Sequence, residues 1–243
     1  MRAAQLVVRT VGELMITSGG LVLLFLVWQL VWTDVVADRS QARTTDALVE
    51  QWDADAQAAP LEPLGDDPTL VAPGDEASTP LAEPVLAALP SAALAVLHVP
   101  EFGNDYAVPV LEGTTAEVLK EGIGRYTGSA DAGEVGNFAL AGHRTTYGAP
   151  FNPIAELDLG DPVVVETADA YYVYTVVDTL IVDPNEVSVI APVPGRPGET
   201  PTEAYLTMTS CHPMYSARQR YIVHAVLEST SARAEGPPAA LTP

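Results

Sequence analysis

The sequence predicts a mainly β domain at residues 92–228, a sandwich or barrel of short strands, preceded by an apolar helix. Short apolar or alternating runs recur in this region between turn residues, a pattern typical of strands joined by tight turns. A long uncharged apolar stretch lies near the N-terminus. The expected strands are Ala95–Val99, Ala107–Val110, Asn137–Ala141, Pro162–Glu166, Tyr171–Val182, Ala204–Thr209 and Gln219–Leu227.

Residues 14–36 are expected to form a transmembrane anchor. The stretch Leu14–Thr33 contains no charged residue and has about the 20 residues that a helix needs to cross a bilayer. Arginines precede it and acidic residues follow it, so the positive-inside tendency places residues 1–13 in the cytoplasm and the part of the chain after Thr33 outside the cell. A cleaved signal peptide is the alternative, but its apolar region is shorter and ends at an A-x-A-like site, which Asp34–Ala37 does not resemble.

Residues 37–91 are expected to form an acidic, Pro/Ala-rich stalk, with a short solvated helix at 39–58. Prolines and acidic residues dominate its second part, and such a composition buries too little apolar surface to offset the loss of chain entropy. The tail 229–243 is expected to be disordered for the same reason. The net charge of −21 argues against nucleic acid as a partner, because phosphates would be repelled.

Two short helices are expected within the domain. The segment Thr115–Gly122 can be capped at its start by Thr114 or Thr115 and ended by Gly122. A further helical turn fits Pro153–Leu157. About 135 residues are enough to enclose one hydrophobic core, so a single domain is predicted.

Three strand ends carry the residues that can take part in catalysis. Cys211 ends one run, His143 follows another, and Arg218 and Arg220 begin the last. A thiolate is the nucleophilic form of cysteine, and a neighbouring imidazole and guanidinium can activate it and stabilise the oxyanion that forms when a carbonyl is attacked. These groups suffice for acyl transfer without a metal or a cofactor. Because Cys211 is the single cysteine, no intrachain disulfide is possible, and a buried inert thiol is the alternative.

The residue types alone do not decide which histidine is the general base or which arginine assists the thiol. The histidines are His98, His143, His212 and His224. In a strand, His212 would point away from its neighbour Cys211, and His224 lies within an apolar run where a structural role is commoner. Arg218 and Arg220 have the same strand parity, so either can face the site, and Arg144, directly after His143, is the least favoured of the three arginines.

At these three places the chain resembles the sortase family. Residues 207–211, TMTSC, are similar to the family signature T-L-x-T-C, and residues 220–223 resemble the R-x-(I/L)-(V/F) strand that follows it. The Gly-His pair ending at His143 resembles the strand-end histidine that precedes the cysteine. The runs 211–213 and 143–148 are most similar to the class E sortases of actinobacteria, which also carry an N-terminal anchor.

The resemblance implies a closed β-barrel of about eight strands with one or two short helices, and a transpeptidase activity. By motif position, Cys211 is the nucleophile, His143 is the acid/base, and Arg220 supports the substrate and the oxyanion. The further candidates for substrate binding are Thr209, Ser210 and Tyr147. No metal site is expected, since one cysteine and scattered histidines give poor ligand spacing.

The resemblance also implies the substrates. Class E sortases cleave a Leu-Ala-x-Thr-Gly signal, and others Leu-Pro-x-Thr-Gly, between Thr and Gly through a thioester. The expected partners are secreted proteins with a C-terminal sorting signal, an amine acceptor of a peptidoglycan precursor and the membrane. A pilin-polymerising sortase is one alternative, although Asp67-Pro68-Thr69 lacks the aromatic residue of the usual lid motif. A hydrolytic cysteine peptidase and an inactive β-barrel binding module are the others.

Overall fold

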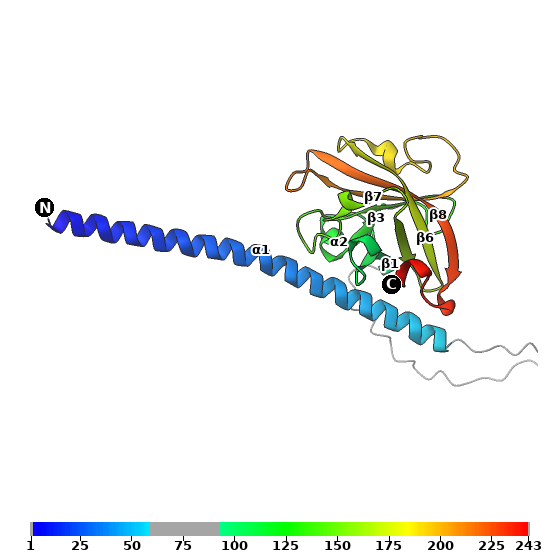
Figure 1. Cartoon of the computed structure of the whole chain (residues 1–243), viewed down its shortest axis with the longest axis horizontal. Helices are drawn as coiled ribbons and strands as arrows, with labels where there is room; N and C mark the ends of the chain where they lie inside the picture. The colour runs from blue at the N-terminus through cyan, green and yellow to red at the C-terminus, as the bar shows by residue number, and fades with distance from the viewer. Residues whose placement is uncertain (1, 59–92, 243) are drawn as a thin grey trace, which may run out of the picture.

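The computed structural model describes residues 2–58 and 93–242, which form a long helix and a β-barrel lying against the C-terminal half of that helix (Figure 1). The barrel is closed, with eight strands in the order β1-β2-β3-β4-β7-β8-β6-β5, so the predicted closed barrel is confirmed. The strands are β1 (Ala93–His98), β2 (Ala107–Glu112), β3 (Ile123–Arg125), β4 (Gly136–Ala141), β5 (Pro162–Glu166), β6 (Ala170–Val182), β7 (Ala204–His212) and β8 (Gln219–Ala232). The helices are α1 (Arg2–Ala58), α2 (Ala116–Glu121) and the 3-10 helices η2 (Pro100–Phe102), η3 (Ile154–Glu156), η4 (Val187–Ile190), η5 (Arg233–Glu235) and η6 (Ala239–Leu241).

The predicted strands and both predicted short helices have counterparts in the structure. Strand β3 was not predicted, because three residues are too few to show an alternation. Thr115 caps α2 by accepting a hydrogen bond from the amide of Val118, at 3.4 Å. At the end of α2, a side chain on Gly122 would place Cβ 2.6 Å from the carbonyl oxygen of Pro109, so only glycine fits there.

Alternation along the strands separates the barrel core from its outer face. Side chains from all around the barrel fill the core, among them Phe138 and Leu140 of β4 and Leu206 and Met208 of β7. Because side chains of a strand alternate between its two faces, Thr207, Thr209 and Cys211 point to the outer face. The core therefore orients the residues of the predicted site.

Helix α1 runs unbroken for 57 residues, through the predicted anchor and into the predicted stalk. Within the part of the chain that the structure describes, no helix combines the length and the apolar character needed to cross a bilayer. The side chains at 26, 27 and 29–34, inside the predicted anchor 14–36, lie outside this description, as does the stalk segment 59–91.

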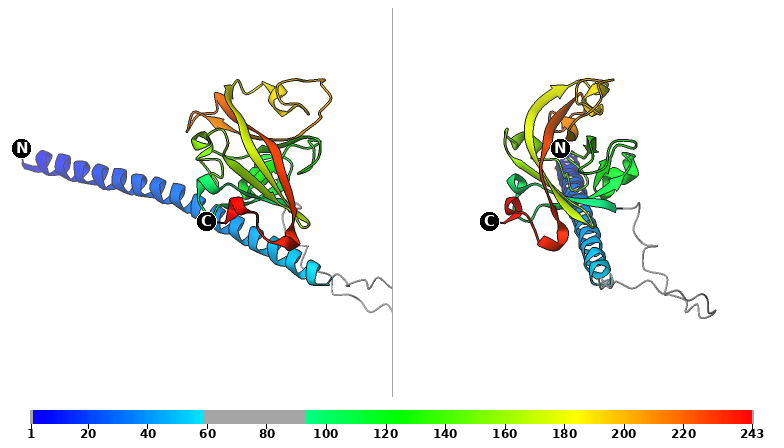
Figure 2. Two further views of the ribbon diagram at one scale, coloured as in Figure 1. Left: turned by 45° about the vertical axis from the view of Figure 1, so that its right-hand side comes forward. Right: turned by 90° about the vertical axis from the view of Figure 1, so that its right-hand side faces the viewer.

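The predicted solvated helix at 39–58 is instead packed on the barrel, so that part of the stalk prediction was wrong (Figure 2). One stripe of α1 is buried, with its residues three or four positions apart as on one helix face. These residues are Ala37, Gln41, Thr45, Leu48 and Trp52. Leu48 and Trp52 pack against Val96 of β1. The stripe mixes polar and apolar residues, which explains why the sequence did not reveal it.

The C-terminal tail is also ordered, which corrects the prediction of disorder for 229–243. Strand β8 extends to Ala232, and η5 and η6 follow it. Ala240 and Leu241 pack against the cluster of Val164, Tyr171 and Val173 on the barrel. The folded unit therefore includes the tail as far as Thr242.

An ionic network centred on the buried Glu166 joins α1, the barrel and the tail. Arg233 donates to Glu166 of β5 at 2.8 Å and to Asp53 of α1 at 2.6 Å. The imidazole of His98 lies 2.9 Å from the second carboxylate oxygen of Glu166, and the hydroxyl of Tyr171 donates to Glu166 at 3.2 Å. Burial would raise the pKa of Glu166, but the hydrogen bonds and charges of His98 and Arg233 outweigh it and hold that pKa below its ordinary value.

The network predicts a stability that depends on acid pH. A carboxyl with a lowered pKa stabilises the fold above its unfolded pKa of about 4.3, and this contribution is lost as pH falls through the folded pKa. Glu166→Gln should lower the free energy of unfolding at pH 7 by about 2–3 kcal/mol and should flatten its decline between pH 7 and pH 3. Urea unfolding at both pH values measures this. Glu235→Gln, at an exposed carboxylate, is the control, and an equal decline in both variants would contradict the prediction.

Candidate active site

The parallel pairing of β4 and β7 brings two of the predicted site residues to one edge of the barrel. Ala141 pairs with Thr209, and the amide of Gly142 donates to the carbonyl of Thr209 at 3.1 Å. His143 and Cys211 each follow this pair by two residues, in the same direction. The end of one strand therefore presents the imidazole where the end of the other presents the thiol.

The antiparallel pairing of β7 and β8 adds the arginine. Cys211 is directly opposite Arg220, and residues opposite one another share a face with Cβ atoms about 4.5–5.5 Å apart. Arg218 lies before the first residue of β8 and has no partner in this register. The guanidinium of Arg220 donates to the carbonyls of Ala217 and Gln219, both at 3.0 Å, so it turns toward the β7–β8 loop.

Cys211 is partly exposed and the two residues before it are buried. The hydroxyl of Thr209 donates to the carbonyl of Leu140 at 3.1 Å and lies on the same face as the thiol. Ser210 points the other way and donates to the carbonyl of Gly142 at 2.9 Å. Ser210 thus ties β7 to β4, and its predicted contact with substrate stays a prediction.

His143 is half buried beneath an aromatic side chain. The ring of Tyr147 lies 5.2 Å from the imidazole, and the ammonium of Lys120 lies 5.5 Å from the Tyr147 ring. Burial, and then the positive charge of Lys120, lower the pKa of His143. At neutral pH the imidazole is therefore largely neutral and able to accept a proton.

Arg144, the arginine that the sequence favoured least, also lies in the site. Its guanidinium is buried, donates to the carbonyl of Asn152 at 2.9 Å and approaches the carbonyl of Cys211 at 3.4 Å. Asn152 donates back to the carbonyl of Arg144 at 2.9 Å. The guanidinium also lies 5.7 Å from the ring of Tyr221. Burial lowers the pKa of Arg144, but a guanidinium stays charged at neutral pH.

Tyr126 is a residue that sequence reasoning missed. It follows β3, which is too short to predict, and its hydroxyl lies 3.0 Å from the hydroxyl of Thr209. It also lines a cavity of about 480 Å³ between the β3–β4 segment and the β6–β7 loop. The other lining residues include Asn137, Ile190 and Pro192. Tyr126 therefore connects this cavity to the face that carries the thiol.

The remaining histidines have other partners. His224 is buried, lies 2.9 Å from the hydroxyl of Thr207, and has a pKa lowered by burial. His98 belongs to the Glu166 network, and His212 lies 3.4 Å from Arg144. Within residues 2–58 and 93–242, no group of three or more His, Cys, Asp or Glu side chains is placed to hold a metal ion.

Comparison with known proteins places the chain among enzymes with this architecture. The Sortase domain family matches residues 97–228. Sortase SrtE1 of Streptomyces coelicolor is 36% identical over 248 residues, covering 98% of this chain and 62% of that protein, so the chain spans less than two thirds of that relative. Sortase SrtE2 of the same species is 34% identical over 239 residues, covering 94% of this chain and 85% of that protein.

A solved structure agrees with these sequence relatives. The crystal structure of sortase E1 from Streptomyces coelicolor with a tripeptide in the active site is 37% identical to this chain, with a TM-score of 0.57. The match covers 62% of this chain and 96% of that one. The part of the chain that is shared is thus the size of the β-barrel.

The position of Arg144 predicts an effect on thiol reactivity. Arg144→Met should slow the alkylation of Cys211 by iodoacetamide at pH 7 by roughly tenfold, because a buried positive charge near the sulfur is lost. Mass spectrometry of the intact protein measures the rate. Arg196→Met, at an exposed arginine paired with Glu199, is the control. Equal rates in the two variants would mean that the Arg144 guanidinium only packs.

Proposed function

The chain belongs to the sortase family of cysteine transpeptidases, and from this premise we propose that it cleaves a C-terminal sorting signal and transfers the protein to an amine. The signal is Leu-Ala-x-Thr-Gly or Leu-Pro-x-Thr-Gly, cut between Thr and Gly. The observation that supports this most directly is the strand register, which sets Cys211 opposite Arg220 and beside the strand end that carries His143.

The residues divide the reaction into two acyl transfers. The thiol of Cys211 gives its proton to His143 as the sulfur attacks the threonine carbonyl and a C–S bond forms, and His143 passes that proton to the leaving amine as the C–N bond to glycine breaks. The acceptor amine then attacks the thioester and gives its proton to His143, and the C–S bond breaks as the sulfur leaves and recovers a proton from His143. The lowered pKa of His143 favours the neutral imidazole that receives the acceptor proton.

Arg220 supplies the charge that the transition state needs. In the proposed reaction its guanidinium leaves the carbonyls of Ala217 and Gln219, which are neutral acceptors, and binds the oxyanion on the threonine carbonyl. A charge-assisted hydrogen bond to an oxyanion is stronger than one to a neutral carbonyl, so Arg220 stabilises the transition state more than the bound substrate. Arg144 remains against the Cys211 carbonyl and holds the strand end in place.

The outer face of β4 and β7 offers the surface for the signal peptide. Thr209 and Tyr126 lie on the approach to the thiol, and the cavity beside Tyr126 is large enough for part of a peptide. Tyr147 borders the site on the side of His143. The related sortase E1 has been solved with a tripeptide in its active site, which supports peptide binding at this position.

We place the enzyme at the cell membrane of a Gram-positive actinobacterium, with its barrel outside. The apolar stretch 14–36 and the arginines before it support this orientation. The acceptor is the amine of a peptidoglycan precursor, because Asp67-Pro68-Thr69 lacks the aromatic residue expected of a pilin-polymerising enzyme.

The activity is tested with short peptides containing Leu-Ala-x-Thr-Gly or Leu-Pro-x-Thr-Gly, with and without an amine. The expected products are a thioester on Cys211, seen as an added mass, and an amine-linked peptide. Cys211→Ala should abolish both and leave the thermal unfolding unchanged. Release of free acid that the amine does not suppress would indicate a hydrolytic peptidase, and an absence of acyl-enzyme with either peptide would indicate a binding module.

Arg220 gives a second test of the mechanism. Arg220→Met should lower kcat/KM for transpeptidation by about 10²–10³-fold, as the loss of an oxyanion donor does in other enzymes. Arg218→Met should have little effect, since Arg218 has no partner in the β7–β8 register. Steady-state kinetics on both variants measures the difference. Equal losses would contradict the assignment of Arg220.

A further inference from the structure

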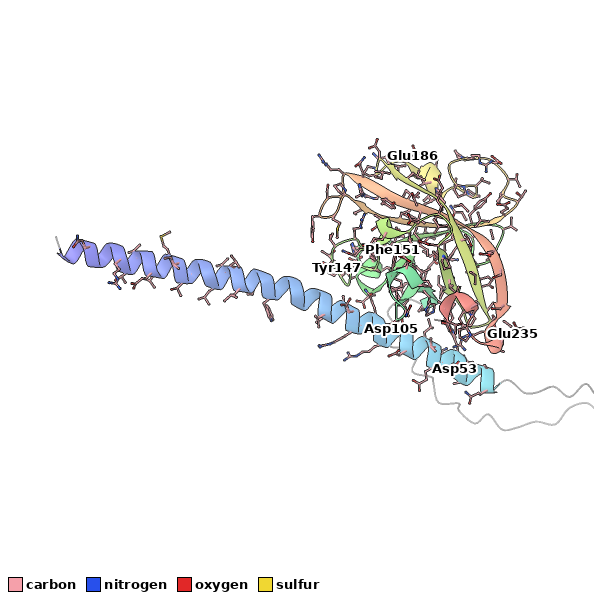
Figure 3. All side chains as sticks on the ribbon, viewed as in Figure 1. Asp53, Asp105, Tyr147, Phe151, Glu186 and Glu235 are labelled. Atoms are coloured by element: carbon pink, nitrogen blue, oxygen red, sulfur yellow. The ribbon has the colours of Figure 1, made fainter. Side chains whose placement is uncertain are left out.

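Helix α1 contacts the loop that carries His143. The amide nitrogen of the Gln41 side chain donates to the backbone carbonyl of Tyr147 at 3.0 Å, although the two residues are 106 positions apart. Gln41 is only 4% exposed. Figure 3 shows Tyr147 on the side of the barrel that faces α1. A buried amide donor is costly without an acceptor, so this hydrogen bond joins the helix to the loop.

The helix and the loop approach each other too closely for a side chain between them. Gly148 has φ +74°, and a Cβ there would lie 2.7 Å from a carboxylate oxygen of Asp38 and 3.0 Å from the amide nitrogen of Gln41. One turn of α1 also reaches α2, where Ser40 donates to Glu121 at 3.1 Å. This turn of the helix therefore lies against both α2 and the loop that follows His143.

Tyr147 transmits the contact to the site. Its φ of 55° is left-handed, a conformation that costs a non-glycine residue about 1 kcal/mol or more, so it needs support from outside the loop. The Gln41 hydrogen bond supplies such support at the Tyr147 carbonyl. The ring of Tyr147 in turn packs against His143, with Lys120 of α2 on its face.

Contacts other than the Gln41 hydrogen bond hold helix α1 on the barrel. Leu48 and Trp52 pack on β1, and Asp53 pairs with Arg233, two to three turns after Gln41. These contacts hold α1 on the barrel without reaching the His143 loop. Gln41 is thus the place where the docked helix acts on the site.

We propose that Gln41 is a positioning residue, through which helix α1 holds Tyr147 against His143 and couples the N-terminal helix to the general base. Its effect on turnover rests on the function proposed above, whereas its effect on His143 does not. When the hydrogen bond is lost, Tyr147 leaves its left-handed conformation and His143 becomes more exposed to water.

The test uses the full chain in detergent micelles. In Gln41→Glu a carboxylate faces the Tyr147 carbonyl, and in Gln41→Leu the donor is absent while the apolar volume is kept. In the wild-type protein, burial and the charge of Lys120 lower the pKa of His143. Both variants should raise this pKa toward its ordinary value, because the imidazole becomes more exposed to water. The imidazole resonance of His143, followed by NMR across pH, measures this. In peptide transfer, both should lower kcat by about three- to tenfold with little change in KM.

Thr45→Val is the matched control. Thr45 lies one turn further on the same buried stripe, and its hydroxyl has no hydrogen-bond partner among the described residues, so the near-isosteric change should leave both His143 and turnover unaltered. Amide hydrogen exchange in residues 45–53 reports whether α1 stays docked.

The outcomes separate this proposal from the proposed function. A shift of the His143 titration in both Gln41 variants, with residues 45–53 still protected and the control unchanged, supports the proposal even if no peptide is transferred. Unaltered titration in both Gln41 variants overturns it, and so does an equal shift in Thr45→Val, which would assign the effect to helix packing in general. If the wild-type protein transfers no peptide while both Gln41 variants show the shift in the His143 titration, only the proposed function is contradicted.

Discussion

The parallel pairing of β4 with β7 is the constraint on which the rest of the site depends. Buried side chains orient the two strands, because Phe138, Leu140, Leu206 and Met208 fix which face of each strand points into the core. The strands then end together, and the pair Ala141–Thr209 places His143 and Cys211 two residues beyond the same edge. Arg220 joins them through the antiparallel register with β8. The geometry thus follows from core packing and strand pairing.

Polar contacts around this edge hold it in place. Arg144 connects the loop after β4, through Asn152, with the end of β7, through the Cys211 carbonyl. Ser210 connects the same two segments through Gly142. Each contact is a single hydrogen bond, of modest net energy, but together they join the two segments that must present the imidazole and the thiol. The contact of α1 with Tyr147 adds a third element to this support.

Much of the site was predictable because its residues follow strands that the sequence shows clearly. Alternation identified β4, β7 and β8, and motif order selected Cys211, His143 and Arg220. Arg144 and Tyr126 were not predictable in the same way. Arg144 comes next to His143, so strand alternation predicts that its side chain points away from the thiol. The turn stabilised by Asn152 instead directs that side chain toward the end of β7. Tyr126 follows a strand of three residues and acts on Thr209 across β4.

The sequence alone determined the family and the strand-rich domain and selected the candidate reacting groups, because these depend on local alternation and on motifs within a few residues. Tertiary structure decided where α1 lies. Its buried stripe, Ala37 to Trp52, mixes apolar residues with Gln41 and Thr45, and these polar residues look solvated until a partner surface is present. Burial of the Gln41 amide is favourable because another segment accepts its hydrogen bond, and that segment is 106 residues away.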